Sequence, residues 1–113
     1  MERMLVTDNI NEVKGFYGRK YRAILNSLEK LNASNFEIDT YWGDNIRLEC
    51  IIQGRRMRVL KEKASEFLVQ YNLLDSHLCD FSEVAFNIKE VCYMIEQAIR
   101  WKNIVYKNEL KIK

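Results

Sequence analysis

The chain has 113 residues, of which 48% are hydrophobic and 30% charged, with a formal net charge of +2 at pH 7. This composition is typical of one globular domain spanning residues 1–113, and it excludes a disordered chain. No apolar run approaches the ~20 residues of a membrane span, and the first residues lack a signal peptide's apolar stretch, so we expect a cytoplasmic protein with no membrane contact.

The first periodic segment covers residues 10–31, where apolar residues recur at every third or fourth position. This spacing predicts a helix with a single apolar face. Asp8 or Asn9 would cap its start, because a short side-chain oxygen accepts hydrogen bonds from the free amides of the first turn. Gly15 and Gly18 weaken the helix, so a start near Gly18 is the alternative.

Residues 36–52 alternate between apolar and polar side chains around a Gly-Asp-Asn turn signal. The alternation predicts two antiparallel strands that share one apolar face. A three-residue turn places Ile38 opposite Cys50 on that face. On the other face it places Asp39 opposite Glu49, and we interpret this region as a solvated, charge-laced surface.

The dipeptide Gln53-Gly54 is a second turn signal and leads into a third strand. A two-residue turn places Cys50 opposite Met57 and Leu48 opposite Val59. Both hairpins then bury the same face, and a slip of one residue would destroy that agreement. The sequence therefore predicts a three-stranded antiparallel meander.

Two more helices are predicted after the meander. Residues 62–74 carry a short apolar stripe, and residues 80–105 carry a longer one. Asp80 and Glu83 have the spacing of a capping box at the start of the second of these helices. Residues 106–113 form a basic tail or a short strand. The expected fold is therefore α+β, in the order α-βββ-α-α, with the helices packed on one face of the sheet.

Candidate catalytic and metal-binding residues are few. The one histidine, His77, is two positions from Cys79, and residues two apart on an extended segment point in different directions. Neither Cys79 nor the other cysteines, Cys50 and Cys92, form the short Cys-x₂-Cys spacing of a structural zinc site. We therefore expect three free thiols, no metal, no cofactor and no enzymatic activity.

Basic residues gather in two segments, near residues 19–22 and 55–63. The residues that we predict to contact a partner or a phosphate are Arg19, Lys20, Arg22, Arg55, Arg56, Arg58, Lys61 and Lys63. Residues 64–99 are strongly acidic by contrast, so the chain is dipolar. A net charge of +2 is low for a dedicated nucleic-acid binder, whose affinity comes largely from neutralised phosphates. These observations favour a protein partner.

The predicted order of elements resembles two families. Over residues 10–74, helix, three-stranded meander and helix resemble the double-stranded-RNA-binding domain, and this resemblance implies that Lys61 and Lys63 contact phosphates. The whole order resembles small phage-encoded anti-CRISPR inhibitors, single domains that block a nuclease by occupying its binding surface. The use of 11 Ile, 10 Lys and 10 Asn against no Pro indicates AT-rich codons, which fits a phage or mobile element.

We therefore expect a non-enzymatic binding protein, an inhibitor or regulator of the phage or mobile-element type that acts through a protein partner. The alternative is a nucleic-acid-binding module that uses the basic residues above. Tyr93, Met94 and Trp101 lie outside or beside the apolar stripe of the last predicted helix. Because such residues often cover a second copy, we also expect a homodimer.

Overall fold

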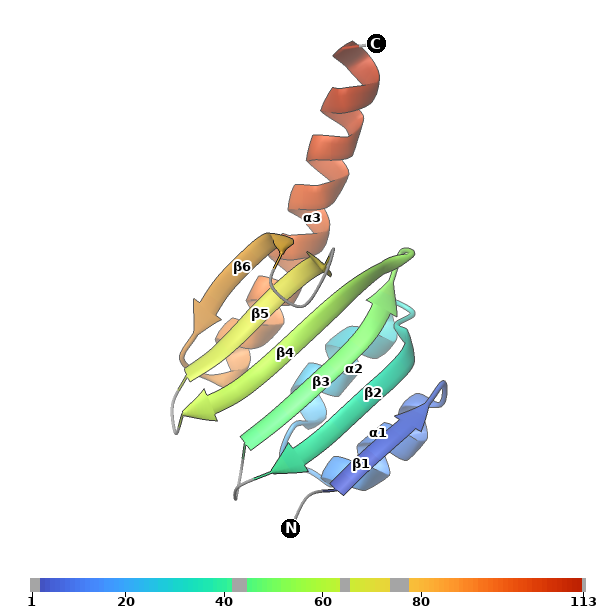
Figure 1. Cartoon of the computed structure of the whole chain (residues 1–113), viewed down its shortest axis with the longest axis vertical. Coiled ribbons are helices and arrows are strands. Elements are labelled where there is room, and N and C mark those ends of the chain that lie inside the picture. Colours follow the sequence, from blue (N-terminus) through green and yellow to red (C-terminus); the bar gives the residue numbers. More distant parts are fainter. Residues whose placement is uncertain (1–2, 42–44, 64–65, 74–77, 113) are drawn as a thin grey trace.

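Six strands and three helices make up the computed structural model, which describes residues 3–41, 45–63, 66–73 and 78–112 (Figure 1). The strands are β1 (Arg3–Thr7), β2 (Ser34–Tyr41), β3 (Asn45–Ile52), β4 (Arg55–Lys63), β5 (Glu66–Leu73) and β6 (Cys79–Ala85). The helices are α1 (Ile10–Tyr17), α2 (Arg22–Lys30) and α3 (Ile88–Ile112). The α+β class is confirmed, but the order is β-α-α-βββββ-α rather than α-βββ-α-α.

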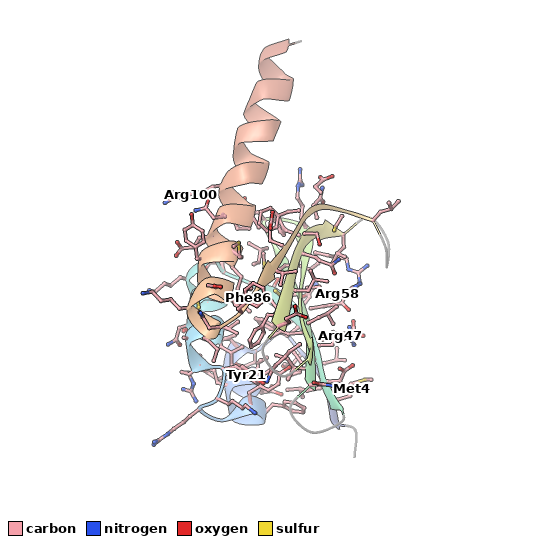
Figure 2. The ribbon with its side chains drawn as sticks, turned by 90° about the vertical axis from the view of Figure 1, so that its left-hand side faces the viewer. Met4, Tyr21, Arg47, Arg58, Phe86 and Arg100 are labelled. Carbon is pink, nitrogen blue, oxygen red and sulfur yellow. The ribbon has the colours of Figure 1, made fainter. Side chains whose placement is uncertain are left out.

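The strands form one antiparallel sheet in chain order, from β1 at one edge to β6 at the other. All three helices pack on the same side of this sheet, as Figures 1 and 2 show. The central row of that side runs across four neighbouring strands through Ile38, Leu48, Val59 and Val69, which are each at most 1% exposed. We call the opposite side, which no described helix covers, the open face.

The second hairpin has the predicted register. Cys50 lies opposite Met57 and Leu48 opposite Val59. Gln53 and Gly54 have φ angles of 53° and 76°, the left-handed geometry that a two-residue turn between antiparallel strands requires. The turn residues and the alternation of apolar and polar side chains on both strands specify the same register. This register is therefore determined by residues close to the turn in the sequence.

The predicted register of the first hairpin is wrong by two residues. Ile38 lies opposite Leu48 rather than Cys50, because β3 already begins at Asn45. A shift of two residues keeps every side chain on its predicted face. The ladder is also interrupted between residues 34 and 37, where Asn35 has a φ of 53°. Trp42, Gly43 and Asp44 lie outside the described residues.

The predicted first helix is two helices. Gly18 ends α1 with φ 67° and ψ −135°, a conformation that glycine adopts without the steric cost of a side chain. Its amide donates to the carbonyl oxygen of Lys14 at 2.8 Å. Asn9 caps the start of α1, as the sequence indicated, and its side chain accepts from the amide of Asn11 at 2.9 Å.

The predicted helix over residues 62–74 is wrong, because β4 extends to residue 63 and residues 66–73 form strand β5. Phe67, Val69 and Tyr71 alternate with half-buried residues and point to the helix side of the sheet. The Tyr71 hydroxyl donates to the carbonyl oxygen of Ile52 at 2.7 Å, which ties β5 to the end of β3.

The predicted helix over residues 80–105 is also wrong at its start, because residues 79–85 form strand β6. The cap of α3 is Asn87, whose side chain accepts from the amide of Glu90 at 2.8 Å. The Glu90 carboxylate in turn accepts from the amide of Phe86 at 3.2 Å. The predicted cap of this helix, Asp80, lies seven residues before Asn87.

Two further elements differ from expectation. Strand β1 was not predicted, and residues 106–112 continue helix α3 rather than forming a tail or a strand. With 25 residues, α3 is about 37 Å long, and its C-terminal part extends past the end of the sheet (Figure 1). In the described part of the chain, no helix combines the length and the apolar character needed to cross a membrane.

Candidate functional site

Glu49, at the centre of the open face, is only 7% exposed. Its neighbours on the adjacent strands are Glu37 and Arg58. Arg56 Nη2 donates to Glu49 Oε1 at 2.6 Å, and Arg47 Nη1 donates to Glu49 Oε2. Arg58 Nε lies 3.7 Å from the same Oε2 atom. Three guanidinium groups therefore surround one carboxylate.

Arg47 extends this arrangement toward β2. Its Nη2 atom lies 3.0 Å from Asp39 Oδ2 and 3.6 Å from Glu37 Oε1. The resulting cluster has three cations and three anions, and we call it the open-face ion network: Glu37, Asp39, Arg47, Glu49, Arg56 and Arg58. Figure 2 shows Arg47 and Arg58 on the side of the sheet away from the helices.

The network favours the charged forms of Glu49 and Arg47. Burial opposes ionisation of Glu49, but the hydrogen bond from Arg56 and the nearby positive charges outweigh it and hold the pKa of Glu49 below its usual range. Burial likewise opposes the charged form of Arg47, but Asp39 and Glu49 raise the pKa of Arg47 above its usual value. At neutral pH these groups are therefore ionised and held by one another.

An apolar strip borders the network. Leu60, Leu68 and Val84 are successive neighbours across β4, β5 and β6, and Leu60 also lies opposite Arg47. Leu60 and Leu68 are half-buried, whereas Val84 is 45% exposed. We call these three residues the open-face apolar strip. No described helix covers it, so it lies at the surface.

A hollow of about 210 Å³ opens beside Glu49, where the ladder of β2 is interrupted. It is lined by Asn35, Glu37, Glu49, Cys50, Ile51 and Arg56. Small-molecule sites usually enclose roughly 300–1,000 Å³ and are mostly apolar. This hollow is smaller and rich in charges, so it fits one protruding side chain of a partner better than a cofactor.

The predicted contact residues of segment 55–63 are divided between the two sides of the sheet. Arg56 and Arg58 are on the open face, where Glu49 engages both. Arg55 is on the helix side, near Tyr71. Burial raises the pKa of Tyr71, and the positive charge of Arg55 lowers it by a smaller amount. Lys63 ends β4, and its side chain lies outside the described part.

Of the remaining predicted residues, Lys61 is on β4, and the other three lie at the turn between α1 and α2. Lys20 lies over the ring of Tyr21, and Lys61 over the ring of Phe67, each with its Nζ atom 5.7 Å from the ring centre. The two rings are 6.5 Å apart in an edge-to-face arrangement, so residues 46 positions apart in the chain come together here. Arg19 and Arg22 are exposed at the same turn.

The three cysteines are free thiols in the structure. Burial raises the pKa of Cys50 to about 12, and the charge of Glu49 acts in the same direction. Cys79 and Cys92 are half-buried, and His77 lies outside the described residues. Within residues 3–41, 45–63, 66–73 and 78–112, no three His, Cys, Asp or Glu side chains gather in a way that would hold a metal ion.

Sequence reasoning missed two features of the open face. The charged residues of β2 to β4 were expected to be solvated, yet the side chains of Asp39, Arg47 and Glu49 are only 18%, 23% and 10% exposed. The apolar strip was missed because residues 66–73 and 79–85 were assigned to helices. Comparison of the chain with family models, with curated proteins and with solved structures finds no match.

Proposed function

We propose that this chain is a non-enzymatic binding protein, an inhibitor or regulator that contacts a protein partner through the open face of its sheet. The observation that carries the proposal is the apolar strip of Leu60, Leu68 and Val84, which borders a network of ordered arginines on a face that no described helix covers. Sheets usually bury an apolar face against another layer. A partner would supply that layer here.

The chemistry of the face fits a protein better than a small molecule. Protein interfaces combine an apolar centre with arginine and a polar rim. Arg47 and Arg58 are already held by carboxylates, so ordering them costs little conformational entropy on binding. The network is neutral overall, and it therefore does not demand a strongly charged partner.

The test is affinity capture from nuclease-treated lysate of the source cell, with surface variants compared in parallel. Val84→Lys and Leu68→Lys place a charge in the apolar strip. Tyr93→Lys is the matched control, because Tyr93 is 56% exposed but lies on α3, on the other side of the sheet. We expect the parent and Tyr93→Lys to retain the same protein and the two strip variants to lose it. Equal retention by all four chains would refute the proposal.

A nucleic-acid-binding function is the second candidate, favoured by two lysines, Lys20 and Lys61, that lie over a pair of neighbouring aromatic rings. Tyr21 and Phe67 are only 4% and 5% exposed, so they offer no surface for stacking bases. Contacts would therefore be with phosphates alone. On the open face, a phosphate would also have to compete with Glu49 for Arg56.

Duplex binding measured against salt concentration tests this second function. If phosphates are bound, the affinity falls steeply with salt and is lost in the double variant Lys20→Glu/Lys61→Glu. Lys30→Glu is the control, since Lys30 is exposed at the far end of α2. Tight binding at physiological salt that the double variant abolishes and the control retains would replace the protein-partner proposal.

A further inference from the structure

Strand β1 is one edge of the sheet, next to β2 and with no described strand on its other side; it carries one charge, Arg3 at its start, and none along residues 4–7. Met4 and Val6 point to the open face, and they are 66% and 70% exposed. The other edge strand, β6, carries two exposed acidic residues, Asp80 and Glu83. Charges on an edge strand discourage pairing with another chain, whereas an uncharged apolar edge offers a template for it.

We propose that two copies of this chain pair through β1 and form one continuous sheet. A two-fold axis perpendicular to the sheet at Leu5 makes the two β1 strands antiparallel, with Leu5 opposite the partner's Leu5. Met4 then lies opposite the partner's Val6, and Val6 opposite the partner's Met4. Residues directly opposite in an antiparallel pair point to the same face, so both contacts are apolar and both lie on the open face.

The helix layer leaves room for this arrangement. Helix α1 packs against both β1 and β2, so its axis lies over the space between them. Since neighbouring strands are about 4.8 Å apart, the two α1 axes would be about 10 Å apart across the two-fold axis. Packed helices are typically separated by 8–10 Å. The second copy therefore extends both layers without a clash or a gap.

Helix α1 also presents a suitable side chain toward the second copy. Lys14 points toward α2, where its Nζ atom lies 2.8 Å from Glu29 Oε1. Phe16 is two residues further along and therefore about 200° around the helix, on the flank away from α2. It is only half-buried in the single chain. Two such flanks would meet beneath the paired β1 strands.

A second copy fits β1 better than an extended peptide from another protein. Under two-fold symmetry the backbones of the two β1 strands can pair, and each apolar side chain of one strand faces an apolar side chain of the other. The expected homodimer was assigned to the last helix from Tyr93, Met94 and Trp101. Tyr93 is exposed, Met94 packs against the core, and the side chain of Trp101 lies outside the described part. Pairing through β1 would instead place self-association at the edge of the sheet far from α3.

Sedimentation equilibrium over a range of concentrations tests the pairing. The parent should change from the monomer mass of 13.5 kDa to twice that mass. Met4→Lys and Val6→Glu should each raise the dissociation constant roughly tenfold, because each places a charge in both symmetry-related contacts. Both sites are exposed in the single chain, so thermal melting of the monomeric variants should match that of the parent.

The double variant M4K/V6E is the decisive chain. It places an ammonium group opposite a carboxylate of the partner at both contacts, and dimerisation should return to within a few-fold of the parent. V84K, on the other edge strand, is the matched control and should dimerise like the parent. A parent that stays monomeric at every attainable concentration, a double variant no better than M4K, or equal weakening by V84K would overturn the pairing.

This pairing is independent of the proposed partner on the open face. V84K should lose the captured protein but remain a dimer. V6E should lose dimerisation and still capture the protein. Each proposal can therefore fail by itself: a parent that stays monomeric refutes the pairing alone, and a V84K chain that still captures the protein refutes the binding face alone.

Discussion

Replacement of Glu49 by glutamine should destabilise the fold, because it removes the negative charge that three arginines share. Breaking a buried ion pair from one side costs about 3–5 kcal/mol. Here the cost is reduced, because Arg47 keeps Asp39 as a partner and the side chain of Arg56 is 47% exposed and can turn to water. We therefore expect a loss of about 2 kcal/mol, seen as a shift of about 1 M in the urea midpoint.

The same variant should reveal the pH dependence of the network. Because the pKa of Glu49 is lowered in the folded chain, its carboxylate contributes fully above the unfolded pKa of about 4.3. That contribution disappears as the pH falls through the folded pKa. The difference in unfolding free energy between the parent and Glu49→Gln should therefore be constant near neutral pH and shrink toward zero below about pH 4.

Glu37→Gln is the matched control for this experiment. The side chain of Glu37 is 50% exposed, and its Oε1 atom lies 3.6 Å from Arg47 Nη2. Such an exposed pair contributes little, so we expect a change within about 0.5 kcal/mol. Equal effects of the two substitutions, or a loss below about 0.5 kcal/mol for Glu49→Gln, would show that the centre of the open face is solvated after all.

Three further experiments probe the sheet. Leu48→Asp puts an unpaired charge at a site that is 1% exposed, and it should abolish the cooperative thermal transition; a parent-like melt would contradict the register. Cys50 should react with a thiol reagent at pH 8 only on unfolding, after Cys79 and Cys92, and early labelling of Cys50 would show that it is accessible. Gln53→Asn should raise the unfolding free energy by about 0.5 kcal/mol, because Asn tolerates a φ of 53° better than Gln; a lower urea midpoint would refute this.

The meander was predictable where turn chemistry and alternation constrain the same strands. Gly54 and the pattern on both sides of it were enough to fix the second hairpin to the residue. In the first hairpin, alternation determined which face Ile38 occupies, but not which residue lies opposite it. A shift of two residues satisfies the pattern equally well, so Leu48 and Cys50 were both acceptable partners.

Strand β5 shows why the later elements were misassigned. Phe67 and Tyr71 are four residues apart, which fits a helix face and a strand face equally well. Val69, between them, is buried in the core beside Val59 of β4, on the face that the helices cover. Long-range pairing of this kind is not visible in a local window of sequence, and it outweighs the local pattern.

The candidate site was only partly predictable for the same reason. Asp39 and Glu49 were correctly predicted to share one charged face, because each alternates with apolar residues along its strand. The predicted register placed Asp39 opposite Glu49, whereas it lies opposite Arg47, so the ion pair between Asp39 and Arg47 was missed. The contact between the rings of Tyr21 and Phe67 likewise arises from packing of the helix turn against the sheet.

Binding of a protein partner to the open face is tested most directly by methyl NMR of the chain titrated with the protein that it captures. The methyl groups of Leu60, Leu68 and Val84 should shift or broaden on binding. Those of Leu31 and Ile88, which are half-buried on the helix side, should stay unchanged. Perturbations at Leu31 and Ile88 with an unchanged apolar strip would contradict the proposed binding face.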